Sequence, residues 1–451
     1  MKGADSERTE SGFKVRTSVD EARRTLREAI LAGGGGDGDV EDDRAGSPLT
    51  GTERIDLERA DGRVLASPVA SARNVPHYRR AAMDGYAVQA SDTFGASERS
   101  PEVLRITEGI GGDASVDPGT AARVHTGSAL PDGADAVVKI ERVTELPSAG
   151  ELEVDDAVAE GENVAPIGED VEEDQHLYDE GHRLRPSDLG LLRSTGYASV
   201  SVAAQPTVGV VPTGEELVTN DPEPGEVIET NGLTVSRLAE RWGARVTCRD
   251  VVTDDPDSLR VAIQRDLTTD VVVTTGGSSV GKRDLLPEVI DELGEVLVHG
   301  VGLKPGHPIC LGLVEETPVL ALPGYPVACI VNAVQFLRPA LAWLEGTTPK
   351  PHPTTRATLE RKIPSEPGSR TFARVQLQER NDERGAREPD DKRGATETDD
   401  EPAVTAVPTR ASGSGILSSV ALADGWVVVD EGREGIPAGE TVAVRNWEPG
   451  R

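Results

Sequence analysis

Apolar residues follow an alternating strand and helix pattern between residues 206 and 347. Short apolar runs that end near glycine or proline predict buried strands, namely TVGVV, DVVVTT, VLVHGV and PVLAL. Between them, apolar residues recur at helical spacing in LTVSRLAERW, SLRVAIQRDL, LLPEVIDELG and VACIVNAVQFLRPAL. Regular alternation of this kind is typical of strands joined by crossover helices. We therefore predict a doubly wound α/β domain with a mainly parallel sheet.

The sequence before this segment has a different pattern. Residues 18–32 predict a helix, because Ser18 can cap it, Glu21 follows three positions later, and apolar residues recur at helical spacing. Short strand-like runs between residues 62 and 143 are separated by Gly, Pro and Asp, which predicts a β-rich part. A further helix is expected at 186–195.

After the Pro-rich hinge TTPKPHPTT the pattern returns to β. Five runs predict the strands of a small closed domain, namely RATLERKI, FARVQLQE, AVTAVPT, GWVVVDEG and TVAVRNW. Two stretches, 33–47 and 379–402, are polar and charged and are expected to be disordered loops.

The charge excludes some classes of partner. The 451 residues carry 47 basic and 79 acidic side chains, a net charge of −32, and 8 lysines stand against 39 arginines. A field this negative repels nucleic acid and anionic lipid, so neither is an expected partner. The dispersed acidic excess suggests a cytoplasm rich in salt, and we treat a halophilic habitat as a hypothesis.

Other features indicate a cytoplasmic protein. No run of about 18 apolar residues is present, which argues against a membrane span. The start, MKGADSERTE, has no apolar core and does not resemble a signal peptide. Cys248, Cys310 and Cys329 lack metal-ligand spacing, so we expect reduced structural thiols.

Candidate chemistry lies in loops that leave the predicted sheet at the carboxyl ends of its strands, where open α/β sheets bind ligands. TTGGSSVGKRD offers glycines for close backbone approach and hydroxyl donors for an anion. Glu215 and Glu216 of PTGEEL suit Mg²⁺, or are simply solvent-facing acids at a helix start. Asp284 could ligate a metal or cap the next helix. LKPGHP adds Lys304 and His307, although His307 could be an ordinary turn histidine.

Residue types and spacing alone indicate a multidomain α/β enzyme that acts on a phosphorylated anion. The order of several motifs adds a resemblance: AAMDGYAV, HTGSALPDGADAVV, GENVAPIGEDV, PTGEEL, VIETNG, TTDDPDSL, TTGGSSVGKRD, LKPGHP, LPGYPVA and SGSGILSSVALADGW. In this order they resemble the MoeA family of molybdopterin molybdenumtransferases, which is related to the E domain of gephyrin. The match extends from about residue 18 to residue 446, apart from the acidic inserts.

The resemblance implies a fold of four parts and an activity. An elongated N-terminal domain would comprise 1–75 and 156–205, with an inserted β-rich domain at 76–155. The α/β molybdopterin-binding domain would be 206–347, and a C-terminal β-barrel would be 348–451. Family members are elongated homodimers that insert molybdate into adenylylated molybdopterin and release AMP with Mg²⁺.

The resemblance also implies roles for single residues. Asp84 and Thr126 would come from the inserted domain and approach the cleft of the partner subunit. Glu216, Asp254 and Asp284 would be essential carboxylates, with Glu216 and Asp284 on Mg²⁺. The remaining expected residues bind substrate: the phosphate cradle would contain Gly276, Gly277, Ser278, Ser279 and Gly281, the molybdate pocket Lys304, His307, Pro308, Arg374 and Ser414, and the LPGYP turn Pro323 and Pro326.

Some positions depart from the family pattern. Tyr325 replaces a frequent Asn, and Ala328 replaces a frequent Ser, so a hydroxyl donor for the oxyanion is missing. His307 replaces a frequent Lys, so its charge would depend on pH near neutrality. Arg79, Arg80 and Ala81 occupy positions where small or polar residues are usual.

These departures keep alternative functions open. The protein could be a non-catalytic molybdopterin-binding scaffold or sensor, or a variant that inserts tungstate. A third alternative is an adenylyltransferase that acts on molybdopterin, although the barrel motif SGSGILSS argues against it.

Overall fold

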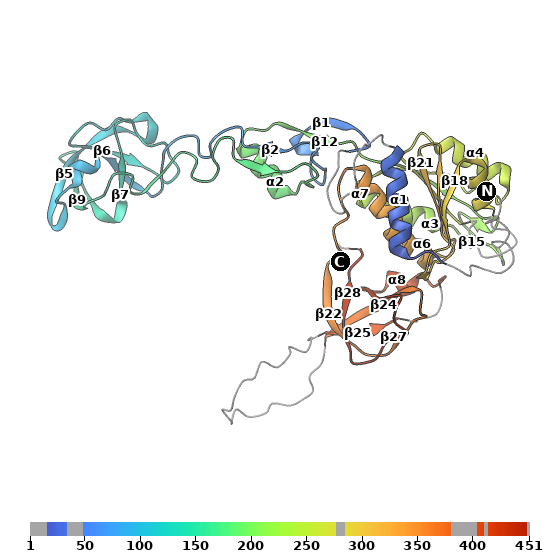
Figure 1. Cartoon of the computed structure of the whole chain (residues 1–451). Helices are drawn as coiled ribbons and strands as arrows, with labels where there is room; N and C mark the ends of the chain where they lie inside the picture. Colours follow the sequence, from blue (N-terminus) through green and yellow to red (C-terminus); the bar gives the residue numbers. More distant parts are fainter. Residues whose placement is uncertain (1–15, 34–47, 277–284, 380–403, 410–413, 449–451) are drawn as a thin grey trace, which may run out of the picture. The chain divides into compact units, whose positions relative to one another are not determined.

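The computed structural model describes residues 16–33, 48–276, 285–379, 404–409 and 414–448. The chain divides into two compact units, Met1–Glu53 with Ala203–Arg451 and Arg54–Val202 (Figure 1). The two segments expected to be disordered loops lie almost entirely outside the described residues, which omit 34–47 and 380–403.

The first unit contains a six-stranded sheet in the order β16-β13-β17-β21-β20-β18. Its first four strands are mutually parallel, while β20 pairs antiparallel with both β21 and β18. The bounds are Thr207–Pro212 for β13, Arg245–Cys248 for β16, Val271–Thr275 for β17, Glu295–His299 for β18, Cys310–Val314 for β20 and Thr317–Leu322 for β21. The predicted doubly wound, mainly parallel sheet is confirmed.

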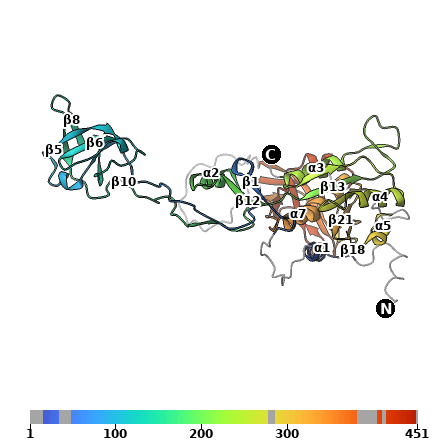
Figure 2. The same ribbon diagram turned by 90° about the horizontal axis from the view of Figure 1, so that it is seen from above.

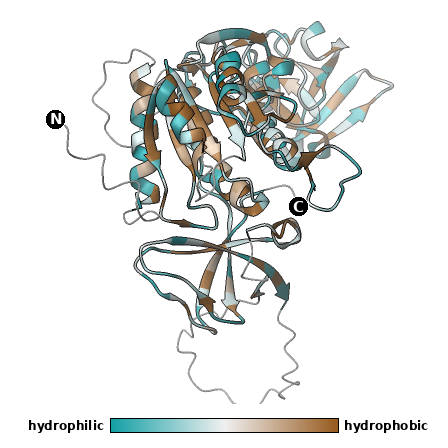
Figure 3. Cartoon of the chain, turned by 90° about the vertical axis from the view of Figure 1, so that its right-hand side faces the viewer, coloured by the Kyte–Doolittle hydropathy of each residue, from teal (hydrophilic) through white to brown (hydrophobic). Residues whose placement is uncertain are grey.

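Helices cover both faces of this sheet because apolar side chains alternate along its strands. Val271 and Val273 pack in one core with α1, α3, α6 and α7, while Val272 packs in a second core with α4 and α5. Figure 3 shows apolar strands beside helices that carry both apolar and polar residues. The helices are α1 Val19–Gly33, α3 Asn231–Arg241, α4 Pro256–Asp266, α5 Leu286–Leu293, α6 Pro326–Asn332 and α7 Arg338–Leu344.

The long apolar helix predicted after LPGYP is a core element. Pro326–Leu344 is continuous, with a π-helical turn at Ala333–Leu337 between α6 and α7. By length and composition this helix could cross a membrane, but 89% of its most apolar window is buried inside the protein. Burial of this kind is what a core helix requires.

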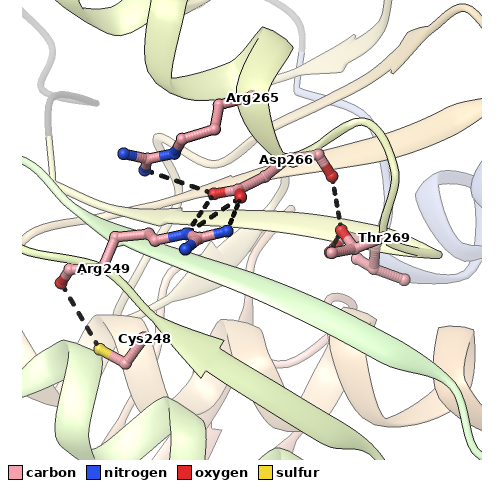
Figure 4. A network of polar contacts seen from close by, with 6 residues as sticks. Cys248, Arg249, Arg265, Asp266 and Thr269 are labelled. Atoms are coloured by element: carbon pink, nitrogen blue, oxygen red, sulfur yellow. Dashed lines mark hydrogen bonds and ion pairs between the residues drawn. The ribbon is translucent and has the colours of Figure 1, made fainter.

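A buried ion pair fixes the end of α4 against the sheet. Asp266 is fully buried and accepts hydrogen bonds from Arg249, which follows β16 (Figure 4). Gly209 in β13 makes room for this carboxylate, because a Cβ at that position would lie 2.9 Å from Asp266 Cβ. A buried carboxylate without a partner would be costly, so the pair explains why Arg249 and Asp266 occur together.

The C-terminal part of the first unit is a closed β-barrel in the order β24-β25-β22-β28-β26, closed by the pairing of β24 with β26. Strand β19, Leu303–Lys304, adds to it by pairing parallel with β24. The bounds are Thr354–Leu359 for β22, Arg370–Glu379 for β24, Val404–Pro408 for β25, Gly425–Val429 for β26 and Thr441–Arg445 for β28. The predicted small closed β domain is confirmed.

The second unit is β-rich, as expected. Its six-stranded sheet has the order β7-β4-β6-β5-β9-β8. The bounds are Gly85–Val88 for β4, Ser97–Ile110 for β5, Thr120–Val124 for β6, Ala136–Lys139 for β7, Val143–Leu146 for β8 and Glu151–Asp156 for β9. Helix α2, Pro186–Ser194, confirms the helix expected there.

One strand was missed, and one expectation needs correction. Strand β20 was not predicted, although CLGLV is an apolar run between two turns. Cys248 is exposed, whereas Cys310 and Cys329 are buried free thiols as expected of structural cysteines. Cys248 is exposed because it is the last residue of β16, an edge strand whose residues are mostly exposed.

Candidate active site

The predicted loops meet at the carboxyl edge of the parallel strands. Pro212 is paired with Thr275, and Thr275 with Leu322, so the next residues of β13, β17 and β21 leave the sheet together. Gly276 has φ +135°, and a Cβ there would lie 2.1 Å from the carbonyl oxygen of Thr213. Only glycine permits this approach, which brings bare backbone to the edge as an anion-binding loop requires.

Asp254 joins this edge from the loop after β16. Val252 bridges Thr213, and the Gly214 N–H donates to the Val252 carbonyl at 3.1 Å. The neighbouring Asp255, not Asp254, caps α4 by accepting from the N–H groups of Asp257 and Ser258. The Asp254 carboxylate is therefore not used for capping.

The environment of Asp254 disfavours its charge. Burial raises its pKa above the ordinary value, and the nearby carboxylates of Glu216 and Glu215 add to this effect. The Thr213 side chain opposes this effect by lowering the pKa, but Asp254 Oδ1 is buried without a hydrogen bond of ordinary length in the part of the chain that the structure describes. A cation at this edge would relieve both the repulsion and the unpaired oxygen.

The carboxylates at this edge fit Mg²⁺ better than a fully protein-bound metal. Within the described ranges, no three Asp, Glu, His or Cys side chains are close enough together to hold one ion. Mg²⁺ is commonly held by one or two carboxylates with water and phosphate oxygens, and Glu216 and Asp254 could supply these carboxylates. Five predicted residues, Asp284, Gly277, Ser278, Ser279 and Gly281, lie outside the described residues.

A second predicted group lines a cavity of about 410 Å³ between the LKPGHP turn and the barrel. Lys304, His307, Arg374 and Ser414 all contribute to its wall, as predicted from distant segments. Arg374 is only 5% exposed, and burial lowers its pKa. Pro308, Pro323 and Pro326 are not among the lining residues; Pro326 instead begins α6.

Charge in this cavity is partly compensated. Glu366, which also lines it, forms an ion pair with Lys304, and this pairing lowers the pKa of the Glu366 carboxyl. Burial, together with the cations Arg16 and Lys304, lowers the pKa of His307. His307 is therefore neutral near pH 7 and supplies a ring nitrogen rather than a charge.

Sequence reasoning missed Lys362 and Glu366 in this cavity. Lysine is scarce in this chain, and that scarcity was the available signal for Lys362. Nothing in the sequence pattern distinguished Glu366 from the many other acids.

Helix α6 connects the cavity walls. Asn332, which is fully buried, donates through Nδ2 to the carbonyl oxygens of Gly306 at 2.9 Å and Ala328 at 2.8 Å. At the other end of α6 the Val327 N–H donates to the Ser414 carbonyl at 3.0 Å. Sequence reasoning also missed Asn332, since an asparagine inside an apolar helix pattern carries no distinctive spacing.

The turn before α6 is fixed from the sheet side. Asn231, in the motif VIETNG, donates through Nδ2 to the Gly324 carbonyl at 2.6 Å. Tyr325 is 65% exposed, and Gly415 lies against its ring, because a Cβ at Gly415 would be 3.3 Å from Tyr325 Cδ1. The LPGYP turn is therefore held by the start of α3 and contacted by Gly415.

The second unit brings Asp84 and Thr126 together. Gly85 of β4 is paired with Val124 of β6, so the residues just beyond both strands are neighbours. Asp84 Oδ1 accepts from the Thr126 N–H at 2.7 Å and from its hydroxyl at 3.1 Å. These bonds lower the pKa of Asp84, whose side chain is exposed.

The neighbouring arginines contact their own unit. Arg80 forms an ion pair with Glu169 at 3.5 Å, and Arg79 donates to the Asp135 carbonyl at 3.3 Å. Ala81 is buried. The unusual residues before Asp84 are therefore accommodated within the β-rich unit.

Comparisons with known proteins agree with this arrangement. Residues 17–196 match the family model "MoeA N-terminal region (domain I and II)", residues 209–343 match "Probable molybdopterin binding domain", and residues 392–447 match "MoeA C-terminal region (domain IV)". The molybdopterin molybdenumtransferase of Bacillus subtilis is 30% identical over 404 residues, which are 87% of this chain and 89% of that protein.

Two further relatives match this chain over most of their own length. The Staphylococcus aureus (strain COL) molybdopterin molybdenumtransferase is 29% identical, covering 86% of this chain and 90% of that protein. A solved structure of a MoeA molybdopterin biosynthesis protein from Pyrococcus horikoshii is 31% identical, with a TM-score of 0.75, and covers 96% of this chain and 100% of its own. The chain belongs to the MoeA family of molybdopterin molybdenumtransferases.

Proposed function

We propose that this chain inserts molybdate into adenylylated molybdopterin and releases AMP, with Mg²⁺ as its metal. The observation that carries the proposal is the cavity, which gathers Lys304, Arg374 and Ser414 from three separate segments. Molybdate is a dianion, and two cations with hydroxyl donors offer charge-assisted hydrogen bonds to its oxygens. In a chain of charge −32, such a local group of cations favours an anionic substrate.

The nucleotide and pterin bind at the strand edge in this proposal. Bare backbone at Gly276 approaches the phosphates, and the Asn231 bond to Gly324 holds the facing turn. Glu216 and Asp254, with Asp284, would hold Mg²⁺. When bound, Mg²⁺ neutralises the charge that develops as the adenylate phosphoanhydride is broken.

The proposal includes a homodimer in the cytoplasm. The exposed carboxylate of Asp84, ionised and fixed by Thr126, would complete the cleft of the partner subunit. The domains in this proposal are 1–75 with 156–205, 76–155, 206–347 and 348–451.

Two alternatives have specific observations in their favour. Ala328 is 2% exposed and supplies no hydroxyl, and the lowered pKa of His307 leaves the cavity with one charge fewer than a lysine would give. Weaker oxyanion binding would fit a molybdopterin-binding scaffold, or selection of tungstate.

The proposal is tested by molybdate binding to the full chain and to Arg374→Gln. We expect the substitution to weaken molybdate binding at least about tenfold, as loss of a buried charge-assisted contact does. The exposed barrel residue Arg356 provides a control, Arg356→Gln, that should bind normally. An unchanged molybdate affinity in Arg374→Gln would show that molybdate does not bind in this cavity.

A further inference from the structure

Lys362 lines the cavity that the proposed function assigns to molybdate. It follows β22 of the barrel and stands directly before the short strand β23, Ile363–Pro364. The facing wall is the LKPGHP turn, which lies between β18 and β20, and β18 packs beside α1 (Figure 2). The cavity therefore receives a lysine from each wall, Lys304 from the turn and Lys362 from the barrel.

The backbone on either side of Lys362 is fixed to the barrel. Ile363 is 3% exposed, packs in the barrel core and is paired with Ile436. Arg361 donates through Nη2 to the Pro408 carbonyl at 2.8 Å. Because successive side chains of an extended segment point to opposite sides, the burial of Ile363 leaves Lys362 on the outer side, where it is exposed. The Lys362 ammonium group therefore stands on a fixed backbone with a flexible stem.

The charge of Lys362 is available to a bound anion. The other lysine of the cavity, Lys304, forms an ion pair with Glu366, and Lys304 and Arg16 both lower the pKa of the Glu366 carboxyl. Lys362, in contrast, makes no hydrogen bond or ion pair with any residue that the structure describes. An anion that enters the cavity can therefore contact Lys362 without displacing another group.

Lys362 also decides the net charge of the cavity. The described side chains that line it include three cations and one carboxylate, a net charge of +2: Lys304, Lys362, Arg374 and Glu366. His307 adds no charge near pH 7, because burial lowers its pKa. A net charge of +2 balances a dianion, whereas the single positive charge that would remain without Lys362 balances a monoanion.

We propose that Lys362 is a specificity-determining residue, whose ammonium group contacts the bound oxyanion and makes the cavity select a tetrahedral dianion over a monoanion of the same shape. This inference rests on the proposed function, in which molybdate occupies the cavity. An ammonium is a compact point charge with rotatable donors, so it responds to the charge of an anion more than to its geometry. Arg374, which is 5% exposed, fixes the position of the anion, and the exposed Lys362 supplies the second charge.

The test compares two tetrahedral oxyanions, the molybdate dianion and the perchlorate monoanion, by calorimetry and competition with the full chain in a constant background of KCl. Lys362→Gln should weaken molybdate binding about three- to tenfold and perchlorate binding about twofold or less. Its Tm should stay unchanged, as is usual for an exposed position. Lys362→Arg keeps the charge and should retain the preference for molybdate. Lys350→Gln is the matched control, since Lys350 is an exposed lysine of the same unit outside the cavity lining.

Arg374→Gln separates this inference from the proposed function. If Arg374→Gln weakens molybdate binding but Lys362→Gln does not, or if Lys362→Gln weakens both anions equally, the inference is wrong and the cavity remains the molybdate site. If neither substitution weakens molybdate binding, the cavity is not the molybdate site and both proposals fail there. A preference for molybdate that falls in Lys362→Gln and is retained in Lys362→Arg supports the inference.

Discussion

Asp84 accepts two hydrogen bonds from Thr126, one from its N–H and one from its hydroxyl, although the residues are 42 positions apart. Thr126 thereby holds the carboxylate at the surface of the β-rich unit and keeps it ionised at neutral pH. Because this carboxylate is exposed, it keeps its hydration. Its desolvation would cost free energy only when another molecule covers it. This relationship makes Asp84 suitable for a role in a cleft that two chains form.

Asp84→Asn should separate that role from folding. Asparagine can still accept the Thr126 bonds, so Tm should change little, as is usual for exposed positions. We expect AMP release to fall at least about tenfold, because the negative charge is lost. Asp61→Asn, another exposed acid of the same unit, should keep full activity. An unchanged rate in Asp84→Asn would take this residue out of the reaction.

Asp254→Asn tests the metal. The folded-state pKa of Asp254 lies above its unfolded value, so its ionised form costs stability at neutral pH. This cost declines as the pH falls through the folded pKa and is gone below the unfolded pKa. Without Mg²⁺, Asp254→Asn should therefore be no less stable than the unmodified chain at pH 7.

The same pKa predicts how Mg²⁺ binding depends on pH. The Mg²⁺ affinity, measured by calorimetry, should decline on acidification because protonated Asp254 cannot ligate the ion. This decline should begin at a higher pH than it would for an aspartate of ordinary pKa. In Asp254→Asn the affinity should be weak at every pH. Equal Mg²⁺ affinity in both proteins would show that other residues hold the ion.

Glu366→Gln should strengthen oxyanion binding. Glu366 is paired with Lys304, so an incoming anion must replace this carboxylate, and removing its charge frees the lysine. We expect the molybdate Kd to fall about two- to fivefold, in keeping with an exposed ion pair. Glu360→Gln is the control, since Glu360 pairs with Arg361 outside the cavity. A weaker or unchanged affinity in Glu366→Gln would contradict competition at Lys304.

Salt dependence tests the hypothesis of a salt-rich habitat. Screening of the mutual repulsion in a chain of charge −32 should stabilise the compact state. The Tm should therefore rise as KCl is increased from about 0.1 M to the molar range. Equal or better stability in dilute buffer would refute salt adaptation.

The sequence predicted the fold well where the alternation of apolar side chains along a strand determines which core each side chain joins. Val271, Val272 and Val273 alternate between two cores, and this pattern defines a buried strand with helices on both faces. The antiparallel strand β20 was missed because its sequence, CLGLV, is short and is interrupted by Gly312.

The site was predictable only in part. The family resemblance implied both Lys304 and Arg374, which the fold brings into one cavity. Glu366 and Asn332 act through contacts between segments distant in sequence, and no local pattern reports such contacts.

Molybdate-dependent AMP release tests the central claim most directly. The purified full chain would be incubated with adenylylated molybdopterin and Mg²⁺ in concentrated KCl, with and without molybdate, and AMP would be followed. The account predicts AMP release that requires molybdate and is accompanied by cofactor formation. A parallel arm with tungstate addresses the choice of metal. Tight binding of the pterin nucleotide without AMP release would contradict the account and indicate a binding scaffold.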